Sequence, residues 1–222
     1  MALNLNFGSG NGGSGDIIPL VKYDARAGRL SKRDYVGGEY VVTDITSSFM
    51  AVFDFENIET GWLSFATGGA PDMAVARFGD PVPAQPSPDH KQGIRMLIQL
   101  SSKLDGSIRE LAGNSKAMLR GIDAVHTEFL EGVKTNPGKL PVIKLKDTVA
   151  STTGEGARKS TNYIPVFEIV KWVDRPEKLV YVPKARAVSS APAAAPPATG
   201  SKAFAAPAPA PALIADDEDD FG

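Results

Sequence analysis

The sequence predicts a mainly β fold, a five-stranded Greek-key barrel with a single helix between the third and fourth strands. Segments rich in β-branched and aromatic residues recur through the middle of the chain, and one segment there has the periodicity of an amphipathic helix. The order of three strand regions, one helix and two strands is that of such a barrel. Other small β-barrels share this order, so the topology within the class stays open.

The first strand region is predicted within residues 39–78, where Val, Ile, Tyr, Phe and Trp are concentrated. The strands expected there are residues 39–45, 49–56, 61–65 and 73–78. Four prolines from Pro81 to Pro88 then predict a loop, because proline cannot donate a hydrogen bond to a strand ladder.

The second and third strand regions are predicted at residues 94–100 and 107–112. Asp105–Gly106 lies between them, and this pair favours a tight hairpin turn.

A helix is predicted from Ser115 to Glu131, with Asn114 as its N-cap. Four apolar residues at intervals of four, three and four form one stripe, which indicates a buried helix face. They are Met118, Ile122, Val125 and Phe129.

The last two strands are predicted at residues 139–146 and 163–173. Residues 150–162 between them are rich in Gly, Ser and Thr, and they carry Arg158 and Lys159. We expect a mobile basic loop there, in a position that often holds the ligand in this barrel class.

Composition divides the chain into four parts. Residues 1–16 are a Gly/Ser-rich leader, and residues 17–182 are the expected folded domain. Residues 183–212 contain 7 Pro and 13 Ala, which predicts a disordered linker, and residues 213–222 are an acidic tail.

The net charge of -2 is unevenly distributed. Residues 1–212 hold all 24 Lys and Arg and 21 of the 26 Asp and Glu, a net charge of +3, whereas the last ten residues carry -5. Any contact with a polyanion must therefore come from a local basic patch, for which the tail would compete.

No established catalytic or metal-binding motif is found. Cysteine is absent, and the two histidines, His90 and His126, have no ligand partner at metal-binding spacing. Residues 154–161 superficially resemble a phosphate-binding loop, but Arg158 stands where that motif needs Gly before Lys159. We therefore expect that the protein binds no cofactor and is not an enzyme.

Targeting segments are not expected either. The chain has no apolar run long enough to cross a membrane, and its N-terminus lacks the basic region of a signal peptide. A cytoplasmic protein is the resulting expectation.

Aromatic residues and positive charges alternate along the predicted strands. Single-stranded nucleic acid binds to such surfaces, because bases stack on rings while Lys and Arg contact phosphates. The stacking candidates are Trp62, Phe65, Tyr163, Phe167 and Trp172, and the phosphate-binding candidates are Arg77, Arg95, Lys144, Lys146, Arg158 and Lys159. The alternative is that the rings fill the core and the charges solvate its exterior.

The tail is the most distinctive segment. Asp216, Asp217, Glu218, Asp219 and Asp220 are followed by one aromatic residue, Phe221. An acidic tip with an apolar anchor on a long tether favours a peptide that docks into a basic pocket of another protein, although acidic runs also serve solubility alone.

Together these features resemble bacteriophage and bacterial single-stranded DNA-binding proteins, which combine an oligonucleotide-binding (OB-fold) barrel with an acidic tail ending in Phe. The tip 216–221 is the specific match, and residues 139–144 and 160–173 resemble phage-encoded proteins of this kind. In that family the aromatic residue is usually the last one, whereas Gly222 follows Phe221 here.

The resemblance implies a sequence-independent protein that coats single-stranded DNA during phage replication, recombination or repair, in the host cytoplasm. Its tail would occupy the basic DNA groove in the free protein and, once displaced, recruit a polymerase, helicase or nuclease. The oligomeric state stays open, a homo-oligomer included.

Two other functions remain alternatives. One is a protein-interaction adaptor whose barrel binds a peptide. The other is a metal-dependent nuclease with Asp54, Glu56 and Glu59 as magnesium ligands, for which a solvated strand edge is the simpler interpretation.

Overall fold

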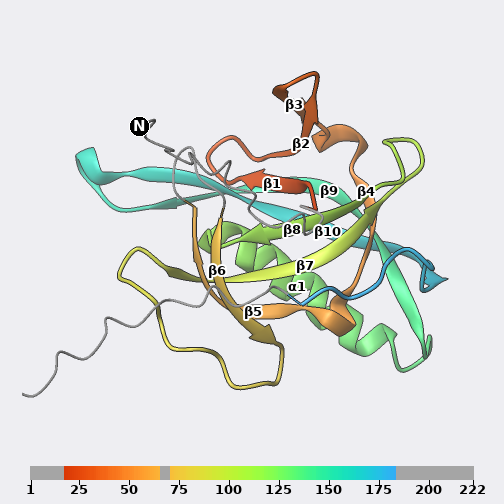
Figure 1. Ribbon diagram of the computed structural model, residues 1–222. Helices are drawn as coiled ribbons and strands as arrows, with labels where there is room; N and C mark the ends of the chain where they lie inside the picture. Colours follow the sequence, from red (N-terminus) through yellow and green to blue (C-terminus); the bar gives the residue numbers. More distant parts are fainter. Residues whose placement is uncertain (1–17, 66–70, 184–222) are drawn as a thin grey trace, which may run out of the picture. The chain divides into compact units, whose positions relative to one another are not determined.

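The computed structural model describes residues 18–65 and 71–183 (Figure 1). In this part of the chain the fold is mainly β with one α-helix, as the sequence predicts. The leader 1–16, nearly all of the linker 183–212 and the tail 213–222 lie outside the described residues.

Ten strands form one sheet. They are β1 (Leu20–Asp24), β2 (Arg29–Val36), β3 (Glu39–Asp44), β4 (Met50–Phe53), β5 (Glu59–Ser64), β6 (Asp72–Arg77), β7 (Lys91–Leu100), β8 (Ile108–Gly113), β9 (Lys139–Thr153) and β10 (Ser160–Asp174). The strand order is β10-β9-β4-β7-β8-β1-β2-β3, and β5 joins β6 to the free part of β7. Short 3-10 turns, η1 (Thr46–Ser48), η2 (Phe55–Asn57) and η3 (Gly156–Arg158), connect some of them.

The sheet is curled but open, so the predicted closed five-stranded barrel is wrong. Closure would need β8 to pair with β10, and β8 instead pairs in parallel with β1, where Leu20 lies opposite Glu110 and Val21 opposite Leu111. β10 pairs with β9, and β3 ends the sheet on the other side. β1 thus occupies the edge of β8 with which β10 would pair in a closed barrel.

The helix α1 (Lys116–Gly132) lies within one residue of its predicted bounds. Its N-cap is Ser115, whose hydroxyl accepts a hydrogen bond from the Met118 amide at 3.3 Å, and not the predicted Asn114. The Asn114 side chain instead donates to the Leu63 carbonyl at 3.0 Å and so ties the helix start to β5. All four residues of the predicted apolar stripe are buried.

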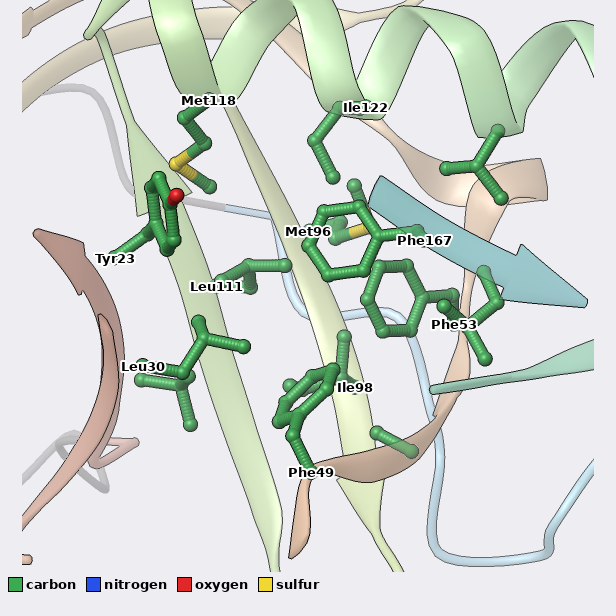
Figure 2. Packing of buried hydrophobic residues seen from close by; sticks show 14 of the residues in the cluster. Tyr23, Leu30, Phe49, Phe53, Met96, Ile98, Leu111, Met118, Ile122 and Phe167 are labelled. Carbon is green, nitrogen blue, oxygen red and sulfur yellow. The ribbon is translucent and has the colours of Figure 1, made fainter. Parts of the chain in front are cut away.

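The core lies between the helix and the concave face of the sheet (Figure 2). Met118 and Ile122 reach down from the helix onto rings and aliphatic side chains from β1, β2, β4, β7, β8 and β10. Fully buried members include Leu30, Phe53, Met96, Ile98 and Leu111. This packing fixes which face of each strand points outward.

The segment that follows β10 covers part of the outer face of the sheet. We call residues 175–183 the strap. Leu179 is completely buried and packs with Leu97 of β7 and Leu140 of β9. Arg175 donates to both oxygens of Asp54, at 2.7 and 2.9 Å. The central strand β7 is therefore buried on both faces.

Candidate nucleic-acid interface

A groove of about 690 Å³ opens on the outer face of the sheet, beside the strap. Its walls come from η1 and the start of β4, the turn after β7, and the facing parts of β9 and β10. Three lysines, four serines and one glutamine supply its polar side chains, and we call it the lysine groove. They are Lys103, Lys144, Lys171, Ser47, Ser48, Ser101, Ser102 and Gln99.

Strand register sets the outward direction of Lys144. Met50 of β4 lies opposite Lys144, and Val52 lies opposite Val142, so these four side chains share one face. Ile143, between the two β9 residues, is buried in the core on the other face. Lys144 must therefore point away from the core and into the groove.

A β-bulge brings Lys171 to the same face. The pairing of β10 with β9 shifts between Ile169 and Lys171, which leaves Val170 as an extra residue. After the bulge the alternation is reversed, so Lys171 turns outward opposite Val142 and Trp172 turns toward the helix.

The groove is electropositive. Glu168 lies beside it, with the Lys144 ammonium 2.9 Å from one carboxylate oxygen and the Lys146 ammonium 3.7 Å from the other. Hydrogen bonding from Lys144 holds the pKa of Glu168 below its usual value. Among the described residues that line the groove there is no carboxylate, so Lys103 and Lys171 add uncompensated charge.

This arrangement suits a phosphate backbone. Ammonium groups give charge-assisted hydrogen bonds to phosphate oxygens, and serine hydroxyls add neutral ones. Contacts of ammonium and hydroxyl groups with phosphate carry no sequence information directly.

Two of the predicted stacking residues belong to the core. Phe167 is buried, with its ring centroid 5.9 Å from that of Phe53 and 6.2 Å from that of Phe49 (Figure 2). Trp172 is half-buried and stacks on Phe129 at 5.8 Å with planes 24° apart. The prediction of Phe167 as a stacking residue is therefore wrong, because its side chain lies on the face of β10 that packs against the helix.

The other three stacking candidates lie apart from the lysine groove. The Trp62 indole donates to the Pro83 carbonyl at 2.9 Å, so it anchors the proline-rich loop. Tyr163 is half-buried against Gly28, and its amide donates to the Ala25 carbonyl at 2.7 Å. Phe65, which directly follows β5, is the most exposed of the five.

Arg95 is not available to a phosphate, which corrects the prediction. It is buried between Glu59, with which it forms a short ion pair, and Glu110, to which its Nε donates at 2.7 Å. Burial alone would lower the pKa of Arg95, but the two carboxylates outweigh burial and raise it. Its Nη1 also donates to the Val182 carbonyl of the strap at 3.1 Å.

The remaining basic candidates are exposed but dispersed. Arg77 donates to the Asn57 side chain at 2.8 Å and lies over the Tyr181 ring, on the side of the strap. Arg158 and Lys159 are exposed at the tip of the β9–β10 hairpin. The structure thus brings Lys144 into the groove, with Lys146 beside it, and leaves the other three elsewhere.

The carboxylates of the nuclease alternative already have cationic or phenolic partners. Arg175 bridges Asp54 and Glu56, with Nη2 2.8 Å from the Glu56 carboxylate. Glu59 pairs with Arg95 and accepts from the Tyr181 hydroxyl at 2.8 Å. In the described ranges no three His, Asp or Glu side chains gather where they could hold a metal ion.

Sequence reasoning missed Lys103, Lys171 and the serines of the lysine groove. Lys171 could not be assigned to a face, because the bulge reverses the alternation of β10 within one residue. The serines of residues 47–48 and 101–102 flank β4 and β7, and this repeated Ser-Ser pair is the one signal that points to them.

Comparisons with protein-family models, with curated proteins and with solved structures find no match for this chain. In the part of the chain that the structure describes, no helix is long and apolar enough to span a membrane. The predicted docking tail, Asp216 to Phe221, lies outside the described residues.

Proposed function

We propose that this chain is a sequence-independent single-stranded DNA-binding protein whose lysine groove holds the phosphate backbone. The observation that carries the proposal is the convergence of Lys103, Lys144 and Lys171 in one open groove whose described lining holds no carboxylate. Coating of DNA in replication, recombination or repair, and recruitment of partners through the tail, follow from the resemblance and belong to the same proposal.

Strand pairing supports the proposal. β4 pairs with β7 and β9, β7 pairs with β8, β9 pairs with β10, and the helix lies between β8 and β9. These are the pairings of a Greek-key barrel of the oligonucleotide-binding class, apart from the one that closes it. The added strands β1, β2 and β3 extend that arrangement into a larger open sheet.

The test is fluorescence anisotropy with labelled single-stranded and duplex oligonucleotides over a salt series. We expect a preference for the single strand and an affinity that falls with salt, because phosphate contacts release counterions. Replacing Lys103, Lys144 and Lys171 with Ala should weaken binding and flatten the slope of log affinity against log salt by about 2.

The matched control replaces Lys22, Lys116 and Lys134 with Ala, which removes the same charge from exposed positions outside the groove. Equal losses in both variants would indicate a diffuse charge effect and refute the lysine groove. If the intact protein bound neither nucleic acid, the adaptor alternative would take precedence.

A further inference from the structure

The β2–β3 hairpin carries two exposed tyrosines. It projects from the body of the sheet (Figure 1) and turns at Gly37 and Gly38, whose φ values of 61° and 93° favour glycine. Tyr35 and Tyr40 lie directly opposite each other, 66% and 63% exposed, with ring centroids 5.0 Å apart. The two rings thus form one exposed aromatic surface, in contrast to single scattered apolar residues.

A cation lies against the tyrosine pair. Arg33 shares the face of Tyr35 because the two are separated by one residue of the strand. Its guanidinium carbon is 3.9 Å from the centroid of the Tyr40 ring, a cation–π contact that holds the ring in place. The hairpin therefore presents two rings and one guanidinium on a single face.

The opposite face anchors the hairpin to the turn that forms one wall of the lysine groove. Lys32 contacts Asp105 at 2.6 Å, and Arg109 contacts Asp34 at 2.6 Å and Asp105 at 2.8 Å. Hydrogen bonding from Lys32 and Ser107 holds the pKa of Asp105 well below its usual value, against the effect of burial. The hairpin is thus fixed at its base while its tyrosines stay exposed.

The foot of the hairpin adjoins the groove. β3 ends at Asp44, three residues before Ser47 of the groove wall, and Asp105 is two residues after Lys103. Tyr40 is four residues up the strand from Asp44, roughly 13 Å at the usual strand rise. The base of the hairpin and this wall of the groove are therefore joined both along the chain and by the ion pair of Lys32 with Asp105.

We propose that Tyr35 and Tyr40 form a second contact site that stacks bases of the single strand whose phosphates lie in the lysine groove. The inference rests on the proposed function and extends the contact surface beyond the five-strand arrangement. Tyrosine rings accept any base on their faces, and the Arg33 guanidinium is available to the adjoining phosphate.

A second copy of the chain fits this surface less well. β3 is the terminal strand, and symmetric antiparallel pairing of Glu39–Asp44 with its copy would place Glu39 opposite Asp44. Like charges directly opposite each other destabilise a strand pair. The charge pattern therefore disfavours this edge-to-edge pairing of two copies.

The experiment compares the full chain with Tyr35→Ser/Tyr40→Ser and with the ring-retaining control Tyr35→Phe/Tyr40→Phe. The probes are a labelled oligothymidylate and an abasic strand of the same length. We expect the Ser variant to lose oligothymidylate affinity at least about fivefold for each ring, with abasic binding unchanged. The Phe variant should bind both probes like the wild type.

The outcomes separate this inference from the proposed function. Normal oligothymidylate binding by the Ser variant, with binding lost in the lysine-groove variant, would overturn the tyrosine site alone. Absence of binding by the wild type would overturn both. Sedimentation of the wild type and of each variant tests for self-association. If the wild type self-associated, and the Ser variant did not but kept its DNA affinity, the hairpin would bind a second copy of the chain and the inference would be refuted.

Discussion

The strap should contribute a measurable part of the stability of the fold, and Leu179→Ala is the perturbation that tests it. Leu179 is completely buried against Leu97 and Leu140. Leucine-to-alanine changes at such sites cost about 2–5 kcal/mol, depending on how far the surroundings relax. Because the strap follows the last strand and can shift, we expect the lower part of that range, about 2–3 kcal/mol.

The ion pair of the strap gives a second, independent measure. Asp54 is fully buried, and without Arg175 its carboxylate would keep, among the described side chains, only the Asn57 amide, 2.9 and 3.1 Å from its two oxygens. Breaking a buried pair costs about 3–5 kcal/mol. The Arg175 side chain is 32% exposed, so water can reach the vacated position and Arg175→Ala should cost less, about 1–3 kcal/mol.

Urea unfolding followed by tryptophan fluorescence is the assay, since Trp62 and Trp172 lie on different parts of the sheet. The matched control is Val180→Ala, adjacent in the strap but 63% exposed, which should change the free energy of unfolding by less than about 0.5 kcal/mol. A Leu179→Ala variant no less stable than this control would refute the packing of the strap on the sheet.

Three further predictions follow from other parts of the molecule. Gly121→Ala should destabilise the fold by about 1–3 kcal/mol in thermal unfolding, because its Cβ would lie 2.4 Å from the Pro165 carbonyl oxygen; an unchanged melting temperature would contradict the close helix–sheet contact. Burial lowers the pKa of His126 below its usual value of 6.5. The neutral imidazole therefore contributes stability that is complete above pH 6.5 and is lost as the pH falls through the lower pKa of the folded state. Urea titrations at stepwise lower pH should show a steeper loss for the wild type than for His126→Gln, and parallel curves would exclude this linkage. Deletion of residues 213–222 should tighten single-strand binding at low salt, because under the proposed function it removes a charge of -5 that would compete with DNA for the groove; unchanged affinity would exclude that competition.

The strand regions and the helix could be predicted because their patterns are local. The stripe from Met118 to Phe129 is set by helical periodicity alone, and it is buried as expected. β1 and β2 were missed because β2 carries Arg29, Lys32, Arg33 and Asp34 within eight residues, which conceals its alternation. Ion pairs to other segments accommodate Arg29, Lys32 and Asp34, and the Tyr40 ring accommodates Arg33; sequence alone does not reveal these contacts.

The lengths of β9 and β10 were underestimated for a different reason. Residues 150–162 have the composition of a loop, yet the strands run to Thr153 and resume at Ser160. Cross-strand pairing sustains them, as in the 3.0 Å hydrogen bond between the Thr152 and Thr161 hydroxyls. β-branched threonine favours this extended pairing, and the predicted basic loop is reduced to residues 154–159.

The candidate site was harder to predict than the fold, because it depends on which face of each strand stays uncovered. Arg95 lies on the outer face of β7, where alternation alone would leave it exposed to solvent. The strap covers that face, and residues 175–183 show no hydrophobic periodicity that would predict their packing on the sheet. Single contacts of Arg175, Leu179, Tyr181 and Val182 hold the strap, and they form no periodic pattern in the sequence.

This covering decides where a ligand can bind. Barrels of the oligonucleotide-binding class bind on the face of their second and third strands, which would correspond to β7 and β8 under the proposed relation to that class. In this chain that face holds the Arg95 ion pairs and, over β7, the strap, so the open basic surface lies one step along the sheet, on β4, β9 and β10. If the lysine groove is the binding surface, Leu179→Ala should lower stability without changing the salt dependence of DNA binding. A change in that dependence would instead place the ligand beneath the strap, on the face that the class ordinarily uses.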